Sequence, residues 1–480
     1  MTKQWFYLMS LVLFITVSSF FLPRFLTYLL DHDTQNKAVL SVSKSLTLSA
    51  YFHHQRRNAI VGSAVWLKNS VALLDESPQL TIEIADYYLK EKKRVKAIFW
   101  YQQAIKYGLD NARHTLASLY YQQQNYQQAK AVLTPILSVK ANDSIESSLV
   151  LLIHIALLEG DIVEATHFTA ELSQLNQHHD LLDELNKYQV FTQDKLEHNI
   201  ATHKHLSDVD FPASEIKACE TSLQFYATNL HDLRYITGLI KQVKLRPLSK
   251  YICFTPARYI PLPTLGCSHD KDEAITCNEA VWHSYKNQID TRYIGVMVPN
   301  GGAKVHNGIL YLDNKDTVAV FAHELAHLLG FIDEYSLPKN HSRCLKPQDK
   351  TFAHNIAVLP KVYHGDKQEI RNKVLMQLPW RAFIKSETPI LTKQDNAWLL
   401  GTPKAFQGEV GVFKSDTCQK ASSDLTNNIQ AYKPLTKRTS LNYFELKFPA
   451  LYQRLLEKET RKFLMPSFHR NIEKALNRAH

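Results

Sequence analysis

The stretch HELAHLLGFIDEY, residues 323–335, is the most informative part of this sequence about its fold and its chemistry. It contains the pattern H-E-x-x-H, in which two histidines stand four positions apart. On a helix, such positions lie on one face a turn apart, so His323 and His327 can reach the same metal ion. Glu324 stands beside the first histidine, where its carboxylate can hold a water molecule that the metal polarises. The pattern therefore predicts a metal site with a base next to it.

The residues around the two histidines favour a helix that ends shortly after the second one. Asp316 or Thr317 can cap its start, and Gly330 is the residue type that lets a helix stop in a left-handed turn. The chain can then reverse and bring Asp333 to the metal as a third ligand, which leaves a fourth position for water. The alternative is a core helix with two hydrogen-bonded histidines and no metal. The apolar helical pattern consists of Val318, Phe321, Leu325, Leu328 and Leu329.

The run 323–335 resembles the metzincin zinc peptidases, in which a ligand follows the second histidine by six residues after a glycine. Asp333 stands where most of those families have His. The ending Asp-Glu-Tyr is similar to the IgA-peptidase-like bacterial zinc peptidases, a weaker resemblance that extends to residues 411–413 and 432–434. The resemblance implies an α+β zincin-type catalytic domain, which we place at residues 248–465.

The same resemblance implies zinc as the cofactor, held by His323, His327 and Asp333, with Glu324 as the general base. The IgA-peptidase-like pattern has one more residue before its Asp-Glu-Tyr, so Glu334 is the alternative third ligand. A distant third ligand, as in gluzincins, would be Glu369 or Glu409.

Three further features are expected by resemblance. Metzincins place a methionine in a turn beneath the zinc, for which Met376 is the candidate; otherwise it is a core residue. Tyr432 or Tyr443 could donate a hydrogen bond to the oxyanion of the transition state. Residues 308–312 would form the edge strand that precedes the metal helix and pairs with an extended substrate. Earlier strand-type runs stand at residues 251–254 and 293–298.

The composition is that of a globular chain. Its 480 residues, 45% of them hydrophobic, suffice for roughly two to four domains. The formal charge of +10 is spread along the sequence without a recognised nucleic-acid module, so we expect no nucleic-acid partner. A basic surface of this kind can attract anionic lipid or cell-wall polymer.

The first thirty residues indicate export. Lys3 precedes residues 5–22, which carry no charge, and a second apolar patch follows at residues 25–30. We expect residues 1–30 to be an uncleaved inner-membrane anchor that sends the body of the chain to the periplasm, or else a cleaved signal peptide and a secreted protein.

Cysteine usage is consistent with an oxidising compartment. An even number of cysteines in an exported chain predicts up to three disulfides, whereas reduced buried cysteines are the alternative. Cys267 with Cys277, and Cys344 with Cys418, are the pairings we expect. The six are Cys219, Cys253, Cys267, Cys277, Cys344 and Cys418.

Residues 37–188 are expected to be all helical, with a weak repeat at an offset of 32. Ala85 recurs as Ala117 and Ala97 as Ala129. This resembles the tetratricopeptide and Sel1-like repeats, which implies a stacked helical-repeat domain with a surface for a protein partner. A plain helical bundle is the alternative. Residues 189–247 are expected to connect the domains, and residues 466–480 to form a basic amphipathic tail.

Together these features predict a multidomain chain, with an all-α helical-repeat domain ahead of an α+β zinc domain. The expected activity is hydrolysis of peptide bonds in a protein or peptide substrate, as an endopeptidase or an exopeptidase. One alternative is an envelope adaptor that acts through its helical repeats and keeps a non-catalytic zinc domain. Another is a zinc amidase that acts on cell-wall peptides.

Overall fold

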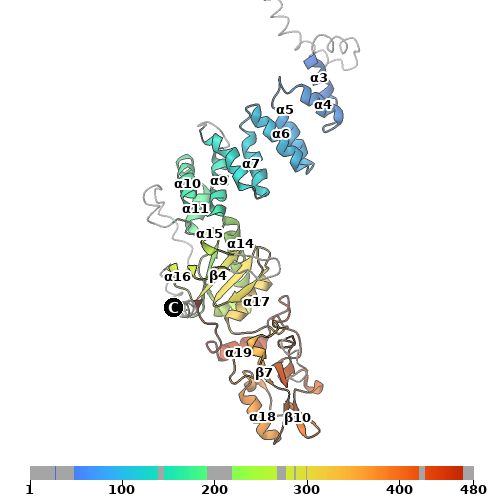
Figure 1. Ribbon diagram of the computed structural model, residues 1–480, viewed down its shortest axis with the longest axis vertical. Coiled ribbons are helices and arrows are strands. Elements are labelled where there is room, and N and C mark those ends of the chain that lie inside the picture. The colour runs from blue at the N-terminus through green and yellow to red at the C-terminus, as the bar shows by residue number, and fades with distance from the viewer. Residues whose placement is uncertain are drawn as a thin grey trace, which may run out of the picture. The chain divides into compact units, whose positions relative to one another are not determined.

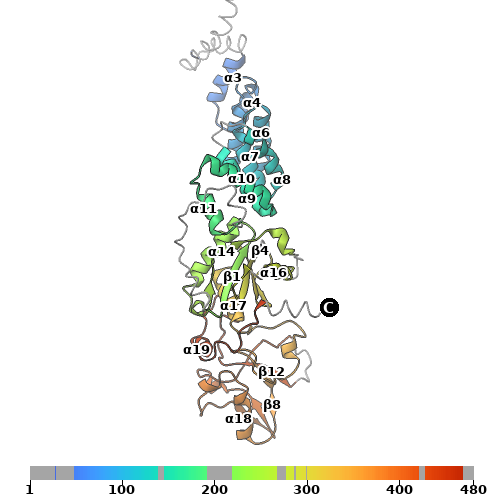
Figure 2. The ribbon, with the colours of Figure 1, turned by 90° about the vertical axis from the view of Figure 1, so that its left-hand side faces the viewer.

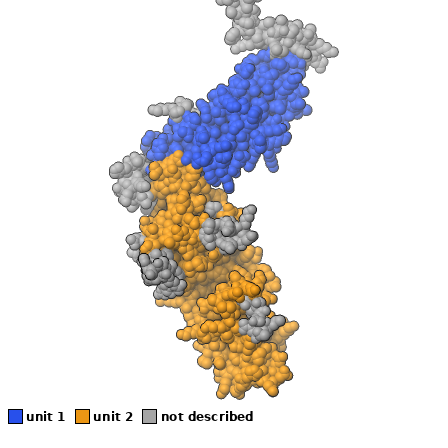
Figure 3. All heavy atoms as spheres, in the orientation of Figure 1, with its two compact units in different colours: residues 1–155, 165–177 blue, residues 156–164, 178–480 orange. Residues whose placement is uncertain are grey.

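The chain divides into two compact units, which consist of residues 1–155 with 165–177 and of residues 156–164 with 178–480 (Figure 3). The membrane segment expected at residues 1–30 lies outside the described residues, apart from residue 28. Among the residues described, no helix is both long and apolar enough to cross a membrane. A computed structural model of the chain describes residues 28, 48–138, 145–191, 219–267, 277–285, 288–298, 300–420 and 428–468.

Most of the described residues in the N-terminal part of the chain lie in helices (Figure 1). Helices α7 and α8 begin 32 residues after α5 and α6, so a helix pair recurs at the expected offset. The alanines that recur at this offset, Ala85, Ala97, Ala117 and Ala129, are fully buried, because a methyl group lets neighbouring helices approach closely. The helices are α3 (Leu48–Arg57), α4 (Ala64–Ala72), α5 (Leu80–Lys90), α6 (Arg94–Lys106), α7 (Ala112–Gln122), α8 (Tyr126–Leu133), α9 (Ile145–Glu159), α10 (Ile162–Leu175) and α11 (Asp180–Lys187).

The second unit contains a mixed six-stranded sheet. Strand β1 pairs in parallel with β2, β3 and β4, β4 pairs in parallel with β6, and β5 pairs antiparallel with β6. The strands are β1 (Ser222–Ala227), β2 (Cys253–Phe254), β3 (Arg258–Tyr259), β4 (Tyr293–Val298), β5 (Lys304–His306) and β6 (Ile309–Asp313).

Strand β1 corrects the expected domain boundary. It lies within residues 189–247, which were expected only to connect domains, and it is followed there by α14 (Leu230–Val243). All six residues of β1 are buried, since the strand has sheet neighbours on both sides. The sheet therefore begins well before residue 248.

The edge strand expected at residues 308–312 is also corrected. Strand β6 has a neighbour on each side, and the strand at this edge of the sheet is β5. Asn307 and Gly308 both have positive φ, at 52° and 80°, which is the requirement of the two-residue turn that folds one strand back onto the next. This turn pairs His306 with Ile309 and places β5 outside β6.

Helices α14 and α17 (Val318–Leu328) pack together and against one face of the sheet (Figures 1 and 2). On this face the rings of Phe225 and Phe321 meet edge to face, with centroids 5.4 Å apart. Gly295 makes room for the contact, because a Cβ at that position would lie 2.4 Å from the Phe225 ring. These contacts position α17 on the sheet.

The opposite face of the sheet carries a separate apolar core. Short helices α15 (Leu262–Leu265) and α16 (Val281–Ser284) contribute to it. Phe468 is fully buried in the same core, so the described start of the expected tail at residues 466–480 packs on its own unit. The core includes Tyr226, Ile260, Leu265, Trp282, Ile294, Val296, Val298, Ile309, Tyr311 and Phe468.

After α17 the chain forms a region with two small antiparallel sheets, ordered β8-β10-β9 and β11-β12-β7. The elements are β7 (Ala357–Pro360), β8 (Val362–Tyr363), α18 (Lys367–Met376), β9 (Leu391–Gln394), β10 (Ala397–Leu400), β11 (Phe413–Lys414), β12 (Ile429–Lys433) and α19 (Ala450–Lys458). With the first sheet, this gives a multidomain mixture of helices and mixed sheets.

All six cysteines form disulfides, so the expectation of three bridges is confirmed. Cys267 pairs with Cys277 and Cys344 with Cys418, as expected. Cys219 pairs with Cys253 and joins the start of β1 to β2. Three bridges indicate that the chain matures in an oxidising compartment.

Candidate metal centre

Helix α17 has well-defined ends. At its start Thr317 is the cap, since its hydroxyl accepts a hydrogen bond from Val320 N at 3.4 Å, while Asp316 accepts from Asp313 N. Beyond its end Gly330 has a φ of +89°, and a Cβ there would lie 2.3 Å from Phe463 O. Glycine is therefore required, and the chain turns back after it as expected.

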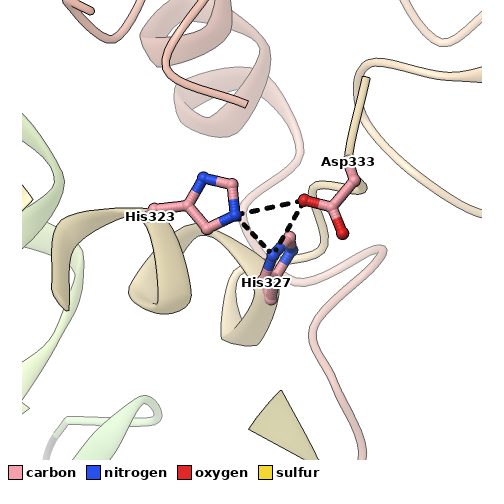
Figure 4. A group of neighbouring side chains, drawn as sticks. All are labelled: His323, His327 and Asp333. Atoms are coloured by element: carbon pink, nitrogen blue, oxygen red, sulfur yellow. Dashed lines mark hydrogen bonds and ion pairs between the residues drawn. The ribbon is translucent and has the colours of Figure 1, made fainter. Parts of the chain in front are cut away.

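Three side chains converge after this turn: His323 and His327 from successive turns of α17, and Asp333 from the segment that follows (Figure 4). Asp333 Oδ1 lies 3.1 Å from His323 Nε2 and 3.2 Å from His327 Nε2, and the two Nε2 atoms are 3.1 Å apart. An ion bound tetrahedrally at about 2.0–2.1 Å would space its ligand atoms roughly 3.3 Å apart. The group therefore has the dimensions to hold a metal ion.

Hydrogen bonds on the far side of each ring orient the two histidines. His323 Nδ1 lies 2.8 Å from Ser440 O, and His327 Nδ1 lies 3.1 Å from Phe331 O. Because a carbonyl oxygen only accepts, each Nδ1 carries the proton and each Nε2 presents its lone pair to the shared point.

The convergence point also contains an unsatisfied acceptor. Asp333 Oδ1 is buried and has no hydrogen-bond partner among the described residues. Two nitrogen lone pairs and a carboxylate oxygen at such distances repel one another unless a positive charge lies between them. This donor set fits a metal cation.

The pKa values of the metal-free site also favour a bound cation. Burial lowers the pKa of His327, but Asp333 and Glu324 outweigh it and raise that pKa to about 9. Burial raises the pKa of Asp333, yet the two histidines hold it well below its usual range. The pocket thus stabilises positive charge at the point where a metal ion would supply it.

Glu324 is buried beside the candidate metal group. Burial raises the pKa of its carboxyl group, an effect that His327 and His323 partly offset. Glu324 directly follows His323 on α17, and its charge interacts with those of both histidines and of Asp333.

Glu334, the alternative third ligand, makes a different set of contacts. Its carboxylate is fully buried, 2.7 Å from Lys433 Nζ, and accepts hydrogen bonds from the Tyr452 hydroxyl and from Asn355 Nδ2. Among the described residues, the group that could hold a metal contains Asp333 and not Glu334.

Met376 and the two distant glutamates also lie apart from the metal group. Met376 ends α18 and is 66% exposed, so it does not pack beneath the metal helix. Glu369 lies in the first turn of α18, and Glu409 pairs with Lys385 at 3.2 Å. Neither glutamate belongs to the candidate metal group that the described residues form.

The two tyrosines singled out from the sequence have the following contacts. The Tyr432 hydroxyl donates to Leu400 O at 3.3 Å, and the Tyr443 ring lies under the Arg438 guanidinium at 4.9 Å. Tyr335 lies at the site instead: its ring is stacked on that of His323, with centroids 6.3 Å apart. The sequence did not single out Tyr335 as a site residue, because it lies after the end of the predicted helix, where no local pattern indicates which way a side chain points.

One buried histidine next to this centre predicts a pH dependence. His354 lies between the rings of Phe331 and Phe463, at 5.0 Å and 4.7 Å, and burial lowers its pKa to about 4, with opposed smaller effects of Glu459 and Lys462. The pKa of His354 is lower in the folded than in the unfolded state. The stabilising contribution of the neutral histidine is therefore complete above pH 6.5, and it is lost as the pH falls towards 4. The full loss is about 3 kcal/mol in the free energy of unfolding.

Urea unfolding at pH 7 and pH 4.5 measures this effect. The variant His354→Phe keeps an aromatic ring between its two neighbours and is expected to lose this part of the pH dependence. An identical pH dependence in parent and variant would contradict the assignment.

Comparison of the chain with protein-family models, with curated proteins and with solved structures gave no match.

Proposed function

We propose that this protein is an exported zinc-dependent peptidase, with zinc held by His323, His327 and Asp333. The observation that carries the proposal is the convergence of two oriented Nε2 atoms and one unsatisfied carboxylate oxygen within 3.1–3.2 Å. Two neutral imidazoles and a carboxylate are a ligand set of catalytic zinc, in which a fourth position remains open. The buried Glu324 beside this set supplies the base that hydrolysis needs.

In this proposal, bound zinc would supply polarisation of a water molecule and of the scissile carbonyl. The Glu324 carboxylate accepts a proton from the water as its oxygen forms a bond to the carbonyl carbon. The same group then delivers that proton to the amine nitrogen as the carbon–nitrogen bond breaks. Because burial raises its pKa, Glu324 is a stronger base than an exposed carboxylate.

The substrate, in this proposal, binds as an extended peptide along β5. This short strand is one edge of the sheet and lies against α17, the helix that carries both histidines. Strand addition at such an edge uses backbone hydrogen bonds and reads little of the side-chain sequence. Strand β5 thus takes the role that residues 308–312 were expected to have.

The location and partners belong to the same proposal. Three disulfides support export. Residues 1–30 would anchor the chain in the inner membrane with its body in the periplasm, and the recurring helix pairs α5–α6 and α7–α8 would bind a protein partner.

The full chain, produced with its disulfides formed, tests the proposal by elemental analysis and by incubation with unfolded casein. We expect one zinc ion per chain, cleavage of casein, and loss of cleavage on chelation that added zinc restores. Zinc without cleavage of any protein would refute the peptidase activity. Absence of zinc from metal-replete protein would refute the site itself.

The choice of third ligand gives a separate prediction. Asp333→Ala is expected to leave the chain folded and to lose bound zinc, because two imidazoles alone hold the ion too weakly to survive dialysis. Elemental analysis after dialysis measures this, with Glu409→Ala as the control that retains the metal. An Asp333→Ala variant with a full zinc content would show that another residue is the third ligand.

A further inference from the structure

We propose that the buried ion pair between Glu334 and Lys433 is a positioning device for the metal site. The pair would hold together two loops, one that carries the ligand Asp333 and one that orients the ligand His323. The inference rests on the metal site of the proposed function and is independent of the substrate.

The Glu334 carboxylate is held on both oxygens. Lys433 Nζ lies 2.7 Å from Oε2, while the Tyr452 hydroxyl and Asn355 Nδ2 donate to Oε1. The side chains of Glu334 and Lys433 are 0% and 6% exposed, so the pair is shielded from water. A carboxylate with this many partners has a single available position.

The backbone on either side of this carboxylate is fixed as well. Asp333 O accepts from Thr417 Oγ1 at 2.8 Å, and Glu334 N donates to Leu441 O at 2.9 Å. Glu334 O accepts from Ser415 Oγ at 3.3 Å. Since Asp333 is the neighbour of Glu334, fixing one residue fixes the Cα from which the ligand extends.

Lys433 holds the second loop with its two remaining hydrogen bonds. Its Nζ donates to Lys437 O and to Asn442 Oδ1, each at 3.1 Å. Asn442 Oδ1 also accepts from Thr439 N at 3.2 Å, so the loop is closed across Ser440. Ser440 O is the acceptor for His323 Nδ1.

The Lys433 ammonium group therefore connects the segment that carries Asp333 with the loop whose Ser440 carbonyl orients His323. Burial of two charges contributes little to stability compared with an apolar pair, because their desolvation cost is large. What the charges add is fixed hydrogen-bond geometry. Residues that support metal ligands in this way commonly change metal affinity ten- to hundredfold when replaced.

Three variants test this in the full chain: Lys433→Met, Glu334→Gln, and the double variant that combines them. The affinity for Zn²⁺ is measured by competition with a chelator, and the visible absorption of the Co²⁺-loaded protein reports the geometry around the metal. Circular dichroism shows which variants are folded. The double variant contains no uncompensated buried charge, so it keeps the test usable if Lys433→Met fails to fold.

Two controls are matched to these changes. Lys385→Met removes the lysine of an exposed pair with Glu409, 3.2 Å long, that lies apart from the metal group. Val374→Ala destabilises the fully buried side of α18. Both controls are expected to keep the parental zinc affinity and cobalt spectrum.

For Lys433→Met and the double variant we expect a loss of zinc affinity of about ten- to hundredfold and an altered cobalt spectrum. Glu334→Gln should lose less, because its amide oxygen can still accept from Lys433, which also keeps its hydrogen bonds to Lys437 O and Asn442 Oδ1. A folded double variant with parental affinity and spectrum would overturn the inference, as would a parent chain that binds no metal. Neither readout involves peptide cleavage, so a chain that binds zinc without cleaving proteins would refute only the peptidase function.

Discussion

Replacement of Glu324 by Gln is expected to reduce cleavage of unfolded casein by about 10²–10⁴-fold while zinc stays bound, because a positioned general base contributes about that factor. The amide has nearly the shape of the carboxylate but takes up no proton. All three proposed ligands remain in place, since Glu324 is not part of the group formed by His323, His327 and Asp333.

Initial rates of cleavage and zinc content of the same preparations measure this prediction. The variant Lys385→Met, with its change far from α17 in sequence and outside the metal group, is expected to cleave at the parental rate. A Glu324→Gln protein that retains zinc and cleaves as fast as the parent would exclude Glu324 as the base.

Removal of the disulfide between Cys344 and Cys418 is expected to lower the free energy of unfolding by about 4 kcal/mol. The bridge closes a loop with a sequence separation of 74, and the loss of chain entropy in the unfolded state grows with loop length. Both cysteines are buried in an apolar cluster, so alanine is the better replacement, because a serine hydroxyl there would have to find a partner.

Urea unfolding followed by tryptophan fluorescence measures this loss in Cys344→Ala/Cys418→Ala. The matched control Cys267→Ala/Cys277→Ala opens a loop with a separation of 10 and is expected to lose only about 3 kcal/mol. An equal or larger loss in the control would contradict the dependence on loop length.

Local patterns in the sequence were sufficient to predict the metal helix. Its cap, its apolar face and the glycine at its end all depend on residues within one or two turns. The structure brings His323, His327 and Asp333 together because these local features agree. The three disulfides were predictable for a different reason, the even number of cysteines in a chain that looks exported.

The errors have physical causes. Strand β1 was not predicted because its sequence mixes polar and apolar residues. The strand is nevertheless buried, and the Gln224 side chain donates a hydrogen bond to the Pro256 carbonyl. The edge was misplaced although Asn307-Gly308 is a hairpin signal in the sequence. Met376 was expected beneath the metal on the basis of family resemblance, yet it is exposed at the end of α18.

The roles of Lys433 and Ser440 could not be predicted, because they act over long sequence separations. Glu334 and Lys433 are 99 positions apart, and His323 and Ser440 are 117 apart. No local pattern links such residues, and only the packed structure shows that they meet.

The distance between His323 and Ser440 along the chain also determines when the centre can form during synthesis. His323 leaves the ribosome 117 residues ahead of the Ser440 carbonyl that fixes its tautomer. Met465 N, which donates to Leu328 O at the end of the same helix, follows later still. A nascent chain therefore carries both histidines long before it can orient His323, whereas Phe331 O, only four residues further on, is available to His327 almost at once. The candidate centre is complete only after Ser440 has been synthesised.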